Sequence, residues 1–326
     1  MIVTIKNRVL GIDVGVSETT IAVVDQRGNI LGTDSFATSD YSDVNSFLDA
    51  LSERVVTTAE AYGGFESVRS VGISAPSANY LTGCIENAPN LPWKGVIPLA
   101  AMLRDRLGLA VALGNDAHIT SLGEHVYGAA HGMQNFIVVS LGHGGFGSCI
   151  FSNGQPHLGY NGSAGEMGHT CVEDNGRLCT CGRKGCIEAY VSDRGIAQTA
   201  REVMDECQQD SMIRQLDQLT PAAIADCCEK GDELALEVYR RTGEVLGLGL
   251  ANVATVLDPE AIVLTGELTE VCQWMVKATR ESFDRHVFRN ISDKVKLVVS
   301  DLKNNERDVL GAAALAWTVK EYSLFK

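Results

Sequence analysis

The chain has 326 residues, of which 45% are hydrophobic and 21% are charged, and its formal net charge is −14. This composition is typical of a packed globular protein and excludes disorder over most of the chain, and the length favours two domains over one. No apolar run reaches the roughly 18–20 residues of a membrane-spanning helix, residues 1–6 do not begin a signal peptide, and no basic stripe could neutralise nucleic-acid phosphates. We therefore expect a cytoplasmic protein with neither a membrane nor a nucleic-acid partner.

The first half of the chain alternates short apolar runs with helical patterns. Gly-containing or polar turns bound the apolar runs, which is typical of buried strands; the expected strands are residues 9–13, 20–25, 30–36, 68–74 and 110–113. Apolar residues at helical spacing predict a helix over 43–62, with Ser42 as its N-cap and Gly63 after its end. A shorter helix over 98–107 begins at a proline and is followed by Gly108.

The second half opens with a near copy of the first strands. Residues 15–31 align without a gap with residues 142–158, and each segment reads as strand, Gly turn, strand, polar turn and strand. This weak repeat predicts a duplicated lobe, although two hairpins can also resemble one another by chance. The patterns beyond it predict a strand over 261–264 and helices over 188–207, 221–230, 232–257, 271–288 and 307–322.

The long helix expected over residues 232–257 contains Gly243, Gly247 and Gly249. A glycine inside a helix costs about 1 kcal/mol relative to alanine. We therefore expect these glycines to allow close packing against a neighbouring element.

Three of the ten cysteines, Cys179, Cys181 and Cys186, fall within eight residues, a segment called here the cysteine knuckle (residues 179–186). A disulfide framework is not expected in a cytosolic chain of this length, and most of the cysteines read as small core hydrophobes. Three thiolates and the imidazole of His169 would complete a tetrahedral structural zinc site, with Gly182 and Gly185 as flexible joints of the loop. Free core cysteines are the alternative.

A second candidate site is the pair Asn115-Asp116, between the strand over 110–113 and a following helix. Asparagine and aspartate at such a junction are often only N-caps. Alternatively, the amide orients a hydroxyl group that the carboxylate deprotonates, which is the arrangement of a general base.

A third candidate is the segment 141–147, which matches the dinucleotide-binding pattern G-x-G-x-x-G. That fingerprint requires a helix after the loop, whereas residues 148–151 continue as a strand. We therefore predict a hairpin whose backbone amides can hold phosphate, and not a Rossmann loop.

Together these motifs resemble the ROK family of sugar kinases and sugar-responsive repressors, over about residues 8–318, and the bacterial glucokinases of that family look most similar. The motifs that carry the resemblance are Asp13-Val14-Gly15, Pro89-Asn90-Leu91-Pro92-Trp93, Asn115-Asp116, Leu141-Gly142, Gly165-Glu166-Met167-Gly168-His169, the cysteine knuckle with Glu188, and Gly311-Ala312-Ala313. The resemblance implies a two-lobed actin-like (ribonuclease H-like) α/β fold with duplicated βββαβα units and an interlobe cleft. The expected lobes are residues 1–116 with the C-terminal helix 310–326, and residues 117–309.

The resemblance also implies the roles of individual residues. Asp116 would be the base for the sugar 6-hydroxyl, and Asp13 would hold Mg²⁺ through water. His169 would bind zinc through one ring nitrogen and sugar through the other. The sugar hydroxyls would be bound by Asn90, Asn115, Asp116, Glu166, His169 and Glu188. The ATP phosphates and adenosine would lie against Asp13, Gly15, Ser17, Gly142, His143, Gly144, Thr265 and Gly266. A homodimer is expected.

Departures from the family pattern lie on the nucleotide side. Val16 and Glu18 replace glycine and lysine of the first loop, His143 replaces threonine of the second, and Glu267 replaces a glycine of the third. The expected function is ATP-dependent phosphorylation of a hexose or N-acetylhexosamine, with glucose first. The alternative is a non-catalytic sugar sensor with a degenerate nucleotide site; a repressor's N-terminal helix-turn-helix is not expected, because the first strand begins by Val9.

Overall fold

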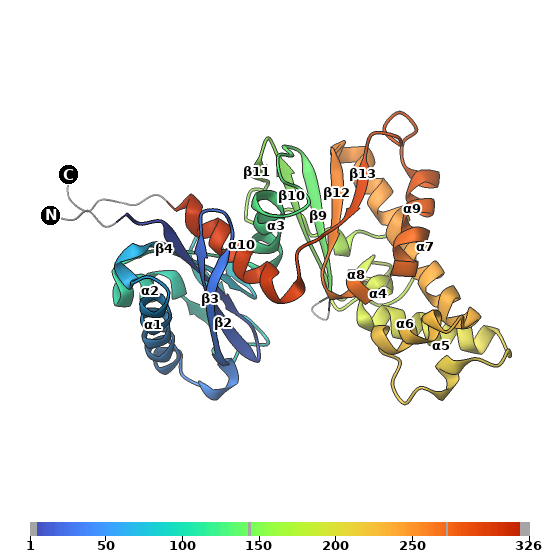
Figure 1. The fold of residues 1–326 in the computed structure, drawn as a ribbon. Helices are drawn as coiled ribbons and strands as arrows, with labels where there is room; N and C mark the ends of the chain where they lie inside the picture. Colours follow the sequence, from blue (N-terminus) through green and yellow to red (C-terminus); the bar gives the residue numbers. More distant parts are fainter. Residues whose placement is uncertain (1–4, 143–144, 272, 320–326) are drawn as a thin grey trace. The chain divides into compact units, whose positions relative to one another are not determined.

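The computed structural model describes residues 5–142, 145–271 and 273–319, so the expected roles of His143 and Gly144 lie outside the described residues. The chain forms two compact units, Met1–Gly132 with Asp301–Lys326, and Met133–Ser300 (Figure 1). The boundaries expected at 116/117 and 309/310 thus lie at 132/133 and 300/301, because helix α3 (Asp116–Val126) packs on helix α10 (Asn304–Thr318) within the first unit. Within the described residues, no helix is long and apolar enough to cross a lipid bilayer.

The first unit is built on a five-stranded sheet of order β3-β2-β1-β4-β8. Its strands are β1 (Arg8–Val14), β2 (Glu18–Asp25), β3 (Ile30–Ala37), β4 (Val68–Ala75) and β8 (Ala110–Asn115). The first three form the predicted antiparallel meander, whereas β1, β4 and β8 run parallel. Helices α1 (Val44–Ala61) and α2 (Leu99–Leu107) cover one face, where Leu10 and Ile12 pack against Phe47 and Leu103.

Helix α10 covers the other face of this sheet at very close range. A Cβ built on Gly11 would lie 2.1 Å from the Val309 carbonyl oxygen, and one on Gly72 would lie 1.9 Å from that of Ala312. Only glycine at these positions lets the backbone of the helix rest directly on the strands. The C-terminal helix therefore completes the core of a unit whose sheet is formed almost 200 residues earlier in the chain.

The second unit repeats the same sheet, with the order β11-β10-β9-β12-β13. Its strands are β9 (Phe136–Gly142), β10 (Gly145–Ser152), β11 (Gln155–Pro156), β12 (Ala261–Thr265) and β13 (Lys296–Val299). An antiparallel meander is again followed by two parallel strands, so the duplication predicted from the repeat is confirmed at the level of topology. The third strand of this meander, β11, is only two residues long.

The helices of the second unit confirm the packing role expected for the glycines. They are α4 (Glu188–Val191), α5 (Asp193–Glu206), α6 (Pro221–Glu229), α7 (Glu233–Leu257), α8 (Glu267–Val271) and α9 (Gln273–His286). A Cβ on Gly243 would lie 2.5 Å from the Met275 carbonyl oxygen, and one on Gly247 would lie 2.4 Å from that of Thr279. Helices α7 and α9 thus contact one another backbone to backbone.

Several expected elements differ in their bounds or number. The single helix expected over 188–207 is two helices, α4 and α5. Helix α4 ends before Ser192, because Ser192 is the N-cap of α5 and its side chain accepts a hydrogen bond from the Gly195 amide. The N-cap of α1 is Asp43, whose carboxylate accepts from the Ser46 amide, and not Ser42. A small sheet of β5 (Ala78–Asn79), β6 (Cys84–Glu86) and β7 (Val96–Ile97) was not predicted, since strands of two or three residues are too short to show an alternating pattern.

Candidate functional site

Carboxylates gather where the parallel strands of the first unit end. Asp13 on β1 is in register with Ser74 on β4, and Ser74 is in register with Gly114, just before Asn115-Asp116. Burial, followed by the charge of Asp308 at the start of α10, raises the pKa of Asp13 to about 7, and the Asp116 carboxylate acts in the same direction. The structure therefore brings the two predicted aspartates together and adds Asp308, which no sequence motif indicated.

The pair Asn115-Asp116 forms the start of α3. The Asn115 side chain accepts from the Ala117 amide at 3.1 Å, so this residue is an N-cap, as the simpler of the two hypotheses required. Asp116 Oδ1 accepts from the same amide at 2.8 Å. These bonds fix both side chains at the end of β8, and capping does not preclude the Asp116 carboxylate from acting as a base.

The first nucleotide-side loop, which connects β1 and β2, is a tight turn. The Gly15 amide donates to the Glu18 carbonyl oxygen at 3.0 Å, and the Thr38 amide donates to that of Ser17 at 2.9 Å. The Ser35 hydroxyl donates to the Glu18 carboxylate at 2.8 Å, which holds this unexpected anion against strand β3. Val16 is 45% exposed beside it.

Asn90 is exposed on a loop that buried neighbours anchor. Leu91 and Trp93 are buried on either side of Pro92, and the Trp93 indole donates to the Tyr41 carbonyl oxygen at 3.0 Å. The Lys94 ammonium donates to the carbonyl oxygens of Pro89 and Leu91. The loop thus presents the Asn90 amide on a fixed frame.

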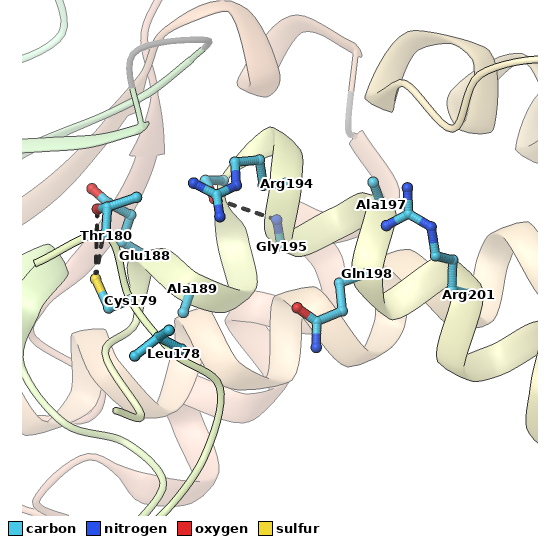
Figure 2. Close-up of a pocket in the computed structure, with 11 residues that line it drawn as sticks. Leu178, Cys179, Thr180, Glu188, Ala189, Arg194, Gly195, Ala197, Gln198 and Arg201 are labelled. Atoms are coloured by element: carbon cyan, nitrogen blue, oxygen red, sulfur yellow. Dashed lines mark hydrogen bonds between the residues drawn. The ribbon is translucent and has the colours of Figure 1, made fainter. Parts of the chain in front are cut away.

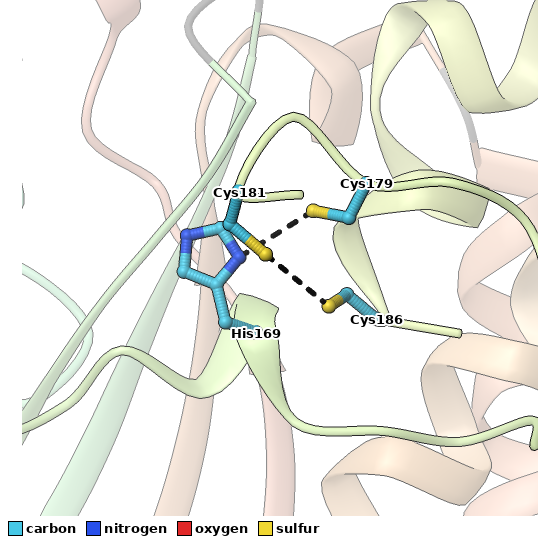
Figure 3. A group of neighbouring side chains, drawn as sticks. All are labelled: His169, Cys179, Cys181 and Cys186. Atoms are coloured by element: carbon cyan, nitrogen blue, oxygen red, sulfur yellow. Dashed lines mark hydrogen bonds between the residues drawn. The ribbon is translucent and has the colours of Figure 1, made fainter. Parts of the chain in front are cut away.

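In the second unit, His169, Cys179, Cys181 and Cys186 offer ligand atoms that all lie within 4.8 Å of one another (Figure 3). His169 Nδ1 lies 3.6 Å from the Cys179 sulfur, and the sulfurs of Cys181 and Cys186 are 3.7 Å apart. One imidazole and three sulfurs at this spacing form the donor set that zinc prefers. The four residues predicted from spacing therefore converge.

Local geometry of the knuckle supports the same conclusion. Gly182 and Gly185 have φ values of 84° and 77°, which confirms the joints expected at these positions. Burial, followed by the neighbouring thiols, raises the pKa of Cys186 to about 12. A divalent metal ion would favour the thiolate form that metal binding requires.

Acidic side chains surround the metal ligands. His169 Nε2, on the far side of the ring from Cys179, lies 4.0 Å from the Glu166 carboxylate. Glu188 Oε1 accepts from the Thr180 hydroxyl at 2.9 Å, and Glu188 Oε2 accepts from the Phe146 amide at 3.3 Å. The predicted residues Glu166, His169 and Glu188 thus form one polar cluster around the knuckle, and Thr180 holds the Glu188 carboxylate in it.

Arg177, which sequence reasoning did not single out, joins the knuckle to helix α5. Its guanidinium donates to the Gly195 carbonyl oxygen at 3.0 Å and to the Thr199 hydroxyl at 2.9 Å, and pairs with Glu202. The same group stacks 4.6 Å from the centre of the Tyr190 ring. Its position two residues before Cys179 was the only available signal, and position alone does not reveal contacts with a later helix.

The second nucleotide-side loop is the hairpin of β9 and β10, in which Gly142 pairs with Gly145. This antiparallel pairing confirms that the G-x-G-x-x-G match is not a Rossmann loop. Buried Thr265 lies in register with Ser140, and Gly266 follows with a φ of 100°. The Glu267 carboxylate comes within 3.2 Å of a Cβ built on Gly142, which places an anion beside the hairpin.

Comparison with known proteins identifies relatives over nearly the whole chain. A sequence model of the ROK family matches residues 9–319. A glucokinase from Halalkalibacterium halodurans is 30% identical over 321 residues, which cover 96% of this chain and 94% of the relative. The crystal structure of a ROK family glucokinase from Streptomyces griseus in complex with glucose and AMPPNP is 28% identical, with a TM-score of 0.77 and coverage of 96% and 100%. An N-acetylglucosamine repressor from Escherichia coli is 32% identical over 217 residues, 67% of this chain and 52% of the repressor.

Proposed function

Since this chain belongs to the ROK family and has the actin-like fold of its sugar kinases, we propose that it transfers a phosphoryl group from ATP to the 6-hydroxyl of a hexose or N-acetylhexosamine, with glucose as the first candidate. The observation that carries the proposal is that the sugar-side residues form one group in each unit. In the second unit, Glu166 and Glu188 lie next to the cluster of His169 and the three cysteines; in the first unit, Asn115 ends β8 and Asp116 begins α3. The relatives named glucokinases span the same length of chain.

Asp116 is the proposed general base. Phosphoryl transfer requires positioning, charge neutralisation and a base for the attacking hydroxyl. Asp116 Oδ1 accepts a hydrogen bond from the Ala117 amide, and this bond holds the carboxylate at the start of α3. Asp116 would accept the proton of the sugar 6-hydroxyl as that oxygen attacks the terminal phosphorus, while the Asn115 side chain helps to orient the sugar.

The polar cluster of the second unit is proposed to bind the other hydroxyl groups. The carboxylates of Glu166 and Glu188 accept hydrogen bonds from hydroxyl groups, and His169 Nε2 faces away from the sulfurs. Asn90 would add a contact from its anchored loop. Thr180 and the Phe146 amide already orient the Glu188 carboxylate, so its contact with sugar costs little additional ordering.

Zinc would be held by His169, Cys179, Cys181 and Cys186, a donor set that fits it. Four protein ligands leave no open position, so the ion would supply rigidity and no chemistry. A cation at Nδ1 also fixes the tautomer at Nε2, which is the nitrogen proposed to face sugar.

The nucleotide is proposed to lie against the two hairpin loops and the turn after β12. Asp13 would hold Mg²⁺ through water. The loop residues are Gly15 and Ser17 of the first hairpin, Gly142, His143 and Gly144 of the second, and Thr265 and Gly266 at the turn. Mg²⁺ would neutralise charge on the transferring phosphoryl group. Glu18 and Glu267 place two carboxylates on this side, so the metal complex of ATP is a better ligand than free ATP.

A coupled ADP-release assay over glucose, mannose and their N-acetylamino forms tests the proposal. The Asp116→Asn variant should lose about 10²–10⁴-fold in kcat, with little change in sugar affinity. The control is Asp301→Asn, an exposed aspartate in the same unit. Full activity of the Asp116→Asn enzyme would show that another group is the base. Light scattering tests the homodimer expected from the family.

A second function, a sugar sensor without turnover, is favoured by Glu18 and Glu267 and by the relatives named as repressors. The two functions differ in one measurement. Calorimetric binding of a sugar, together with no ADP release from any sugar of the panel, would replace the kinase by the sensor.

A further inference from the structure

A cavity of about 350 Å³ lies on the outer side of the knuckle, within the second unit (Figure 2). Thr180 of the knuckle and Leu178 just before it form one wall, Glu188 of α4 forms the end of the cavity, and Arg194, Gln198 and Arg201 of α5 form the other wall. This volume is at the lower end of the roughly 300–1,000 Å³ typical of small-molecule sites. None of the roles proposed above uses the arginine side of this cavity.

The wall on α5 is a positively charged stripe. Arg194, Gln198 and Arg201 follow at intervals of four and three residues, which places them on one face of the helix. Figure 2 shows Thr180 and Glu188 at one end of the row and Arg201 at the other, with Arg194 between them. Two long side chains two turns apart can direct their guanidinium groups to one ligand.

These arginines differ from others in the same unit. Arg177, Arg240 and Arg241 each form an ion pair with a glutamate. Among the residues that the structure describes, no carboxylate lies within 4.0 Å of the guanidinium groups of Arg194 or Arg201. Two guanidinium groups at one cavity provide donors suited to phosphate.

The opposite end of the cavity has a different character. The Glu188 carboxylate would repel a second anionic group, whereas it accepts hydrogen bonds from hydroxyl groups, as it does from the Thr180 hydroxyl at 2.9 Å. A ligand that fits both ends therefore carries a phosphate at one end and hydroxyl groups at the other. Resting on the function proposed above, we propose that this cavity binds a hexose phosphate, the chemical class of the reaction product, at a site that adjoins the sugar cluster and shares Glu188 with it.

Glu188 and Cys179 connect the two sites. The Cys179 sulfur lies 3.6 Å from His169 Nδ1 and 3.8 Å from Glu188 Oε1, and Cys179 also lines the cavity. A hexose phosphate that draws Thr180 or the Glu188 carboxylate toward the cavity takes these groups from the sugar cluster. Because such coupling is reciprocal, bound product would lower the affinity for sugar and provide feedback inhibition.

Calorimetric titration of zinc-loaded protein with glucose 6-phosphate, and separately with inorganic phosphate, tests the proposal. Wild-type protein should bind glucose 6-phosphate more tightly than inorganic phosphate, with one more site than the double variant Arg194→Ala/Arg201→Ala. Each single variant should weaken this site about tenfold or more, because each removes a charge-assisted hydrogen bond. Both arginines are exposed, so the melting temperature should not change.

Arg289→Ala is the matched control, since Arg289 is an exposed arginine of the same unit away from the cavity. Its titration should match the wild type. Equal stoichiometry and affinity in the double variant, or equal affinity for inorganic phosphate and glucose 6-phosphate, would overturn the inference. The readout needs no turnover: a chain without kinase activity can still show the arginine-dependent site, and an active kinase without that site would refute only this inference.

Discussion

Replacing Asp13 by asparagine should stabilise the protein while abolishing turnover under the proposed function. Burial and the Asp308 carboxylate raise the pKa of Asp13 to about 7 from its ordinary value of 3.8. Asp308 is held in place by the Thr120 hydroxyl, which donates to it at 2.9 Å. The native fold therefore keeps Asp13 where its charge is unfavourable, as catalytic and metal-binding sites commonly do.

The magnitude follows from linkage between protonation and folding. Above about pH 7 the carboxylate is ionised in both native and unfolded chains, and the full difference in pKa corresponds to about 4 kcal/mol of lost stability. Between 3.8 and about 7 the native chain binds a proton that the unfolded chain does not, so the loss shrinks as the pH falls. Since the Asp13 side chain keeps some contact with solvent, we expect Asp13→Asn to gain about 2–4 kcal/mol near pH 8.

Urea unfolding of zinc-loaded protein without added Mg²⁺, followed by tryptophan fluorescence at about pH 8 and pH 5, measures this gain. It should be largest at the higher pH and fall to less than half at pH 5. Asp301→Asn, which alters an exposed aspartate, should change stability little at either pH. A gain that is absent, or that does not depend on pH, would refute the placement of Asp13 among repelling carboxylates.

Three further predictions concern the second unit. Chelation or Cys181→Ser should lower both the melting temperature and the sugar affinity, because metal binding is coupled to local folding; a metal-free preparation with an unchanged melting temperature would remove the zinc site. Gly247→Ala should destabilise the protein by about 1–3 kcal/mol despite a gain of about 1 kcal/mol in helix propensity, because its Cβ would lie 2.4 Å from the Thr279 carbonyl oxygen. The denaturant concentration at the midpoint of unfolding should fall, and an unchanged midpoint would contradict this prediction. Thr180→Val should raise the sugar KM about tenfold with little change in kcat, since it removes the 2.9 Å hydrogen bond to Glu188; unchanged kinetics would show that Thr180 does not position this carboxylate.

Much of the fold could be predicted because local patterns encode local structure. The meander over β1 to β3, the helix α7 and the hairpin after Leu141 each follow from residues close together in the chain. The repeat of residues 15–31 in 142–158 predicted the matching sheet orders. The cluster of His169 and the three cysteines could also be predicted, because Cys179, Cys181 and Cys186 are only a few residues apart and His169 precedes them closely.

Other features depended on residues that no local pattern connects. The interruption between α4 and α5 at Ser192 depends on a hydrogen bond from the Gly195 amide to the Ser192 side chain. Whether such a bond replaces a helical backbone bond depends on the surrounding packing. The role of Arg177 became visible only through its contacts with Gly195 and Thr199 on the next helix. The arginine stripe beside the knuckle likewise appears only after α5 is placed against it.

The difference between the features that could be predicted and those that could not has a physical basis. The sequence by itself determined the periodic elements, the duplicated sheet and the grouping of His169 with the three cysteines, since these depend on spacings of a few residues. Tertiary structure alone decided that α10 belongs to the first unit, through the close approach to Gly11 and Gly72, and that Asp308 meets Asp13. Contacts between residues almost 300 positions apart depend on how packed surfaces fit together, and no single segment of the chain predicts that fit.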